Sequence, residues 1–212
     1  MANIEIIGAA QSVFVRTTRI AFEEKGVAYR LISAFPHSPE INALHPFGKI
    51  PVMRHGDFVL FESRAIAAYV DRAFDGPALM PSDTALAATA EQWISAINTS
   101  VFPEIVSYMQ ANAFPKGPNG LRDERLIAET LPVVGKCIDV LNSATAATGH
   151  LAGSDFTLAD MYLMPILAYL RNFPESAEMM RAANPLSTYF ARHSARASFA
   201  KTAPAPLADL RR

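Results

Sequence analysis

Three short segments carry side chains and backbone groups that could bind a small charged ligand. In the first, Ser12 stands where an apolar run ends and a helical pattern, Val13 to Lys25, begins. The unpaired N–H groups of a helix N-terminus and the positive end of its dipole stabilise a negative charge, and a hydroxyl can add a hydrogen bond. Ser12 therefore fits two roles, a plain helix cap or a stabiliser of a bound anion.

The second segment, His45 to Val52, reads HPFGKIPV. The Ile50–Pro51 bond follows a glycine turn and precedes an expected strand, which makes it a candidate cis peptide. A cis bond would turn the backbone of the strand edge toward a ligand, so that a peptide-like substrate could pair with it as an added strand. A plain turn before an edge strand is the alternative.

The third segment, LFESRAI, places Glu62 and Ser63 at the start of another helical pattern. Their groups suit an α-amino acid, with its carboxylate on the N–H and hydroxyl and its ammonium on the glutamate. Favourable dipole interactions explain the same residues without a ligand. A fourth segment, Thr157 to Asp160, has the pattern of a capping box, and we interpret it as structural.

The elements that must position the three segments belong to an α/β domain. Apolar runs alternate with a helical pattern, which indicates a βαβ unit, and the turn pair Gly56-Asp57 joins two short strands in a predicted hairpin. Between these parts, residues 35–46 are rich in proline and histidine and are expected to be looser. The expected strands are 3–7, 27–33, 52–55 and 58–60, and the expected helices are 13–25 and 62–74.

From Pro81 onward the sequence has long helical patterns without strand alternation. The Asp75-Gly76-Pro77 turn is a natural boundary, so the sequence predicts an α/β domain over 1–76 and an all-α domain over 82–212. Pro103, Pro132 and Pro165 should each kink the long helix in which they lie, and the tail from Thr202 should be frayed. The expected helices are 83–112, 121–145, 157–171 and shorter ones before and after Pro185.

Length and composition exclude several classes of protein. Half of the 212 residues are hydrophobic, which is enough for a core without metal or disulfide support, and Cys137 is the lone cysteine. Mixed charges, 19 Lys and Arg against 20 Asp and Glu, indicate neither a nucleic-acid nor an anionic-membrane partner. The N-terminus lacks a signal-peptide pattern and no run of about 18 apolar residues occurs. We therefore expect a cytoplasmic protein that acts on small molecules.

In this order and spacing, the segments resemble the glutathione transferase superfamily over nearly the whole chain. The run SVFVR from Ser12 is similar to a Ser-Pro-Phe-Val-Arg stretch of plant tau-type and related bacterial enzymes, whereas PFG from Pro46 and LFESRAI from Leu60 resemble phi-type members. Val13 replaces the usual proline after the serine, and His45 takes a common asparagine position. The resemblance implies a thioredoxin-like βαβαββα domain and an all-α domain that forms the electrophile-binding wall.

The resemblance also implies glutathione as co-substrate, with no metal, and a role for each candidate residue. Ser12 would donate a hydrogen bond to the glutathione sulfur. Phe47 lies where many members insert an aromatic side chain into a partner subunit, which predicts a homodimer. The implied contacts are Ile50 and cis Pro51 with the cysteine of glutathione, Glu62 and Ser63 with the γ-glutamyl end, and Lys49 and His37 with the glycyl carboxylate.

The predicted activity is attack of a glutathione thiolate on a hydrophobic electrophile, a detoxification reaction. A free thiol has a pKa of about 8.5, and the Ser12 hydroxyl with the helix N-terminus would lower it by roughly 1.5 to 3 units. Because position 12 is not cysteine, the thiol-transferase and reductase branches are not expected. Two alternatives stay open, namely a non-catalytic protein-interaction module with this fold and a glutathione-dependent peroxidase or isomerase.

Overall fold

The computed structural model describes residues 4–113 and 122–205. The chain divides into two compact units, Met1–Met80 with Ala195–Arg212 and Pro81–Ser194. The boundary after Met80 lies a few residues beyond the predicted turn. The residues after Ser194, which the sequence analysis placed in the helical domain, belong to the first unit.

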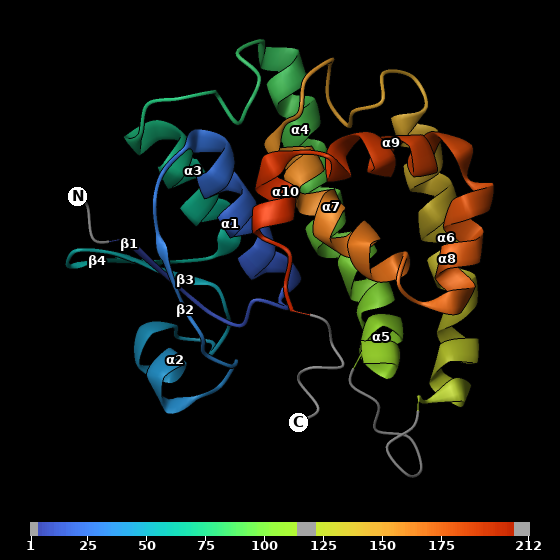
Figure 1. Ribbon diagram of the computed structural model, residues 1–212, viewed down its shortest axis with the longest axis horizontal. Helices are drawn as coiled ribbons and strands as arrows, with labels where there is room; N and C mark the ends of the chain where they lie inside the picture. The colour runs from blue at the N-terminus through green and yellow to red at the C-terminus, as the bar shows by residue number, and fades with distance from the viewer. Residues whose placement is uncertain (1–3, 114–121, 206–212) are drawn as a thin grey trace. The chain divides into compact units, whose positions relative to one another are not determined.

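The first unit is built on a four-stranded mixed sheet with the strand order β2-β1-β3-β4 (Figure 1). Strand β1 pairs in parallel with β2 and antiparallel with β3, which pairs antiparallel with β4. The element order confirms the predicted βαβαββα arrangement. Its elements are β1 (Ile4–Ile7), α1 (Val13–Lys25), β2 (Arg30–Ile32), α2 (Pro39–Leu44), β3 (Val52–His55), β4 (Phe58–Phe61) and α3 (Ser63–Ala73), with α10 (Ala197–Lys201) from the end of the chain.

Helix α1 has the predicted bounds because both of its ends are capped by local sequence. The Ser12 side chain accepts a hydrogen bond from the Val15 N–H, and Gly26 ends the helix in the left-handed conformation with φ of 70°. Helix α2 was implied by the family resemblance but not by the residue pattern, since six residues are too few to show a helical period. Its cap is nevertheless local, because the Ser38 side chain accepts from the Ile41 N–H and Pro39 is the first helical residue.

One row of paired residues crosses the whole sheet. Ile7 on β1 lies opposite Ile32 on β2 and Val52 on β3, and Val52 lies opposite Phe61 on β4. All four side chains belong to the apolar cluster that Ile41 of α2 joins. Helices α1 and α3 cover the opposite face of the sheet (Figure 1). The core of this unit therefore has two layers, one on each side of the sheet.

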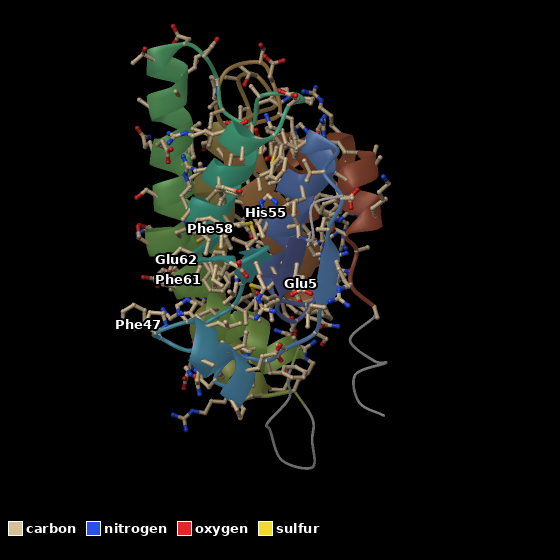
Figure 2. All side chains as sticks on the ribbon, turned by 90° about the vertical axis from the view of Figure 1, so that its left-hand side faces the viewer. Glu5, Phe47, His55, Phe58, Phe61 and Glu62 are labelled. Atoms are coloured by element: carbon tan, nitrogen blue, oxygen red, sulfur yellow. The ribbon has the colours of Figure 1, made fainter. Side chains whose placement is uncertain are left out.

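A charged group also lies on the α2 side of the sheet, two residues before Ile7. Glu5 is only 6% exposed and accepts hydrogen bonds from Arg30 on β2 and Arg54 on β3 (Figure 2). The Arg30 hydrogen bond is the largest cause that keeps the pKa of Glu5 below its ordinary value, and Arg54 adds to it. The carboxylate thus stays charged and satisfied at the centre of three strands.

In its described residues, the second unit consists of helices joined by turns and loops, without a strand. The predicted helix 83–112 is interrupted by a π-helical turn, η1, directly before Pro103, which lacks an N–H and whose ring would crowd the preceding turn of a regular helix. None of the helices in the described ranges is long and apolar enough to span a membrane. The elements are α4 (Thr84–Ala96), η1 (Ile97–Val101), α5 (Phe102–Ala113), α6 (Glu124–Thr145), α7 (Leu158–Leu170), α8 (Pro174–Ala182) and α9 (Asn184–Ser194).

The predicted capping box at the start of α7 is structural, as expected. Asp160 is fully buried and accepts hydrogen bonds from the Thr157 N–H at 2.8 Å and the Leu151 N–H at 2.9 Å. The Tyr189 hydroxyl of α9 donates a further bond at 2.9 Å. Asp160 therefore joins the N-terminus of α7 to the preceding loop and to α9.

The C-terminal segment packs on α1 and does not fray at Thr202. Arg16 donates to the Phe199 carbonyl at 3.0 Å, and Arg19 donates to the Thr202 carbonyl at 3.1 Å. Glu24 accepts two hydrogen bonds from Arg196. The frayed-tail prediction was wrong for Thr202, whose side chain is fully buried, because the contacts that hold this segment are with residues 172 to 183 positions earlier. Residues 206–212 lie outside the described ranges.

A buried ion pair joins α1 to α3. Lys25, with a side chain 4% exposed, lies 3.1 Å from the Asp71 carboxylate, which also accepts a hydrogen bond from the Leu79 N–H. We expect Asp71→Asn to keep the acceptor for Leu79 but to leave Lys25 charged and unpaired, at a cost of about 3 kcal/mol. The free energy of unfolding in urea measures this. Arg125→Met, which removes an exposed ion pair with Glu129, is the control and should cost less than about 0.5 kcal/mol.

Candidate functional site

The row of paired residues in the sheet brings the candidate segments to one edge. Strands β1, β2 and β4 end at Ile7, Ile32 and Phe61, and β3 begins at Val52. These four residues lie side by side. The segments that follow β1, β2 and β4 and the segment that precedes β3 therefore meet at the same edge of the sheet. The Ser12, Ile50–Pro51 and Glu62–Ser63 segments are therefore neighbours, although up to 51 positions separate them.

Ser12 lies at the N-terminus of α1, half-buried. Its oxygen accepts the Val15 N–H at 3.4 Å, a long bond that leaves the hydroxyl proton free to donate elsewhere. Gly8 ends β1 close by, where a Cβ atom would lie 2.6 Å from the Val15 side chain and 3.1 Å from that of Ile50. The absence of a side chain at Gly8 thus lets Ile50 approach the start of α1.

The Ile50–Pro51 peptide bond is cis, which confirms the candidate cis peptide of the sequence analysis. Pro51 is buried and Ile50 is partly buried against the Ile7 and Val52 cluster. Regular pairing of β3 begins only at Val52, so the backbone of Ile50 lies outside the ladder. This position offers peptide groups to a ligand at the edge of the sheet.

Glu62 joins β4 to α3 in an unusual conformation. Its φ is 69°, a left-handed value that costs a non-glycine residue about 1 to 3 kcal/mol and occurs preferentially at ligand sites. The Glu62 side chain is 62% exposed, whereas Ser63 is buried as the first residue of α3. The turn thus presents a carboxylate to solvent directly beside the N-terminus of α3.

The loop around Lys49 is held by close backbone contacts. The His37 N–H donates to the Gly48 carbonyl at 2.8 Å, and Asn42 donates to the His37 carbonyl at 3.0 Å. His37 itself has φ of 62°. His37 and Lys49 are both exposed at this loop, so the predicted pair lies on one part of the surface.

Together these groups suit a small molecule with both charges of an amino acid and a further carboxylate. A hydroxyl and a helix N-terminus favour an anion at Ser12, Glu62 favours a cation, and Lys49 favours a second anion. In the described ranges, no group of three or more His, Cys, Asp or Glu is placed to hold a metal ion.

Comparison with known proteins identifies the family of this chain. The glutathione S-transferase N-terminal domain model matches residues 6–78, and the glutathione S-transferase C-terminal domain model matches residues 102–197. The chain is also 30% identical over 184 residues to glutathione S-transferase F6 of Arabidopsis thaliana, covering 82% of this chain and 86% of that protein. The chain belongs to the glutathione S-transferase family. The resemblance seen in the sequence is thereby confirmed.

Other members match this glutathione S-transferase along almost its whole length. Glutathione S-transferase F12 of Arabidopsis thaliana is 29% identical over 206 residues, with 93% of this chain and 96% of that protein covered. A theta class glutathione S-transferase from Xanthomonas axonopodis pv. citri, solved with glutathione bound, is 27% identical with a TM-score of 0.82. That alignment covers 98% of this chain and all of the other. The two-domain fold is thus shared from end to end.

His45 is part of the site, although the sequence analysis treated it only as a departure from the family pattern. It is 2% exposed, with Nδ1 accepting the Phe47 N–H at 3.0 Å and Nε2 lying 4.0 Å from the Glu62 carboxylate. Its ring centroid is 4.6 Å from that of Phe61 and 6.1 Å from that of Phe47. The signal in the sequence was a histidine directly before the Pro46-Phe47-Gly48 turn.

Gly48 provides a test of how tightly this loop of the transferase is built. Its φ is 63°, and a Cβ atom would lie 2.4 Å from Nδ1 of His37 and 2.6 Å from Oδ1 of Asn42. We expect Gly48→Ala to displace the loop, lower the midpoint of thermal unfolding and weaken ligand binding.

Gly56→Ala is the matched control for Gly48→Ala. Its φ is 60°, but no atom lies within 4 Å of the added methyl group. It should cost only the backbone strain of about 1 kcal/mol and leave ligand binding unchanged. Equal effects of the two substitutions would contradict the tight packing of the Lys49 loop.

Proposed function

We propose that this protein is a glutathione transferase in which Ser12 stabilises the thiolate of glutathione for attack on an electrophilic small molecule. The observation that carries the proposal is the meeting of the Ser12, Ile50 and Glu62 segments at one edge of the sheet, in a chain of this family. The names of the relatives support conjugation over the non-catalytic module, peroxidase or isomerase that the sequence left open.

The role proposed for Ser12 is that of a hydrogen-bond donor. An alcohol is far too weak an acid to supply a base, but its O–H can donate to a thiolate and stabilise it by about 1.5 to 3 kcal/mol. The N-terminus of α1 adds about 0.3 to 1 kcal/mol. Their sum lowers the thiol pKa enough to make the thiolate the main species at neutral pH.

The remaining contacts follow the chemistry of the tripeptide. Glu62 pairs with the α-ammonium of the γ-glutamyl residue, and Ser63 with the N-terminus of α3 binds the adjacent carboxylate. The backbone of Ile50, beside Pro51, pairs with the cysteine of glutathione as an added strand. Lys49 and His37 bind the glycyl carboxylate. The exposed Glu62 and Lys49 and the unpaired Ile50 backbone support these assignments.

The proposal also covers the second substrate, an electrophile, and the location and role of the protein in the cell. The helical unit provides an apolar surface for the electrophile, which is hydrophobic. A cytoplasmic location and a role in detoxification are consistent with glutathione as co-substrate, because cytosolic thiols are kept reduced by glutathione.

We also propose a homodimer in which Phe47 inserts into the partner subunit. Phe47 is 67% exposed at the turn between His45 and Lys49 (Figure 2), the position from which, by the family resemblance, an aromatic side chain enters a partner subunit. Aromatic residues are the commonest energetic anchors of protein interfaces.

Replacing Ser12 tests the proposed chemistry. Ser12→Ala should raise the pKa of the bound thiol by roughly 1 to 2 units and lower kcat/KM with a chloronitroarene at neutral pH by about ten- to a hundredfold. The activity should recover as the pH rises. Ser12→Thr, which keeps a hydroxyl, should retain most of the activity. An unchanged rate and pH profile in Ser12→Ala would exclude the proposed role.

Replacing Phe47 tests the dimer. Phe47→Ser should weaken self-association by about 2 kcal/mol, or roughly thirtyfold in the dissociation constant, as measured by sedimentation equilibrium. Phe35→Ser is the control, because Phe35 is 65% exposed and is not assigned to the interface. A monomeric wild-type protein, or an equal effect of both substitutions, would refute the assignment.

A further inference from the structure

His45 occupies a central place in the loop that leads to Lys49 and Ile50. Its N–H donates to the Ile41 carbonyl at 2.8 Å and ends α2, and its carbonyl accepts the Gly48 N–H at 3.0 Å. The Phe47 N–H donates to Nδ1 of the ring at 3.0 Å. The backbone and the side chain of this residue thus fix the same turn.

The other ring nitrogen of His45 faces the opposite part of the site. Nε2 lies 4.0 Å from the Glu62 carboxylate, and the ring packs against Phe61. The imidazole therefore stands between the loop proposed to bind the cysteine and glycyl parts of glutathione and the carboxylate proposed to bind its ammonium group.

The hydrogen bond from Phe47 selects one protonation state. A ring nitrogen that accepts an N–H has no proton, so neutral His45 carries its proton on Nε2. Imidazolium has a proton on both nitrogens and cannot accept. Protonation of His45 must therefore break the Phe47 bond and leave a new N–H at Nδ1 to be satisfied in a buried position.

Burial and the neighbouring charged groups shift the pKa of the His45 ring in opposite directions. Burial lowers the pKa of His45 below its ordinary value and is the largest cause. Among charged neighbours, Glu62 raises the pKa and Lys49 lowers it. The neutral ring is thus the state at neutral pH, and the ring gains a proton only as the pH falls through this lowered pKa.

We propose that neutral His45 is a positioning residue of the glutathione site, and that its protonation in acid weakens glutathione binding. This inference rests on the proposed function. Protonation of His45 affects the contacts at both ends of the ligand. It releases the turn at Phe47, and it places a cation of the protein beside Glu62, where that cation competes with the γ-glutamyl ammonium.

Thermodynamic linkage between proton binding and ligand binding gives the size and the direction of the expected change in glutathione affinity. If glutathione binds only the form with neutral His45, the affinity falls by up to about tenfold for each pH unit below the pKa of His45 in the free protein. By reciprocity, bound ligand must lower that pKa further. Above the pKa the affinity should not depend on this residue's charge.

The test is calorimetric titration with S-methylglutathione, in which the sulfur cannot ionise, between about pH 4.5 and 7.5. In the wild type the affinity should fall in acid as described. In His45→Asn an amide oxygen can replace Nδ1 as acceptor for Phe47 but cannot gain a proton, so this step should vanish. In His45→Leu the acceptor is lost at every pH, and binding should be weaker even at neutral pH.

The controls separate His45 from other titrating groups. The ligand carboxylates and all other ionisable groups of the protein are the same in both proteins, so the difference between wild type and His45→Asn belongs to His45. His55→Asn, in β3 of the same sheet, should keep the wild-type profile. Histidine NMR of the wild type gives a reading that needs no folded variant, because the pKa of His45 should fall on addition of S-methylglutathione.

Two results have different meanings. If S-methylglutathione does not bind the wild type at neutral pH, the proposed function itself is wrong. If it binds, but wild type and His45→Asn show the same pH profile, or the pKa of His45 does not change on binding, then only the inference about His45 is overturned.

Discussion

The structure of the first unit depends on one row of paired residues across the sheet, Ile32, Ile7, Val52 and Phe61. The row fixes where three strands end and one begins, and its side chains are held together by burial under Ile41 of α2. A shift of one residue in any strand would turn its apolar side chain away from this cluster. The hydrophobic packing of the row therefore also sets the positions of the polar groups at the sheet edge.

The polar groups at that edge are held by the backbone more than by one another. Glu62 is fixed by a left-handed turn and Ser12 by the helix that it caps, while the Lys49 loop depends on hydrogen bonds to His37 and His45. Such a site is built before a ligand arrives, which reduces the entropy lost on binding. His45 differs from the rest because its side chain touches both the loop and the neighbourhood of Glu62.

The sequence predicted best the elements whose first and last residues are set by side chains close to them in the sequence. Helix α1 was correct at both ends because Ser12 and Gly26 are its caps, and the α7 capping box was correct for the same reason. Helix α2 was too short to show a period, and the π-helical turn before Pro103 depends on how the backbone adjusts to a missing N–H. The packing of α10 on α1 was not foreseen, because it depends on contacts such as that between Arg16 and Phe199, which lie 183 positions apart.

By itself the sequence determined the order of elements, the family resemblance and the types of residue at the site, because caps, turns and motifs act within a few residues. Only the tertiary structure decided that Ser12, Ile50 and Glu62 meet at one edge and that His45 is buried beside them. Register across the sheet and burial arise from contacts between distant segments, and no local pattern encodes the distance between His45 and Glu62. The protonation state that His45 requires follows from that burial and from its bond to Phe47.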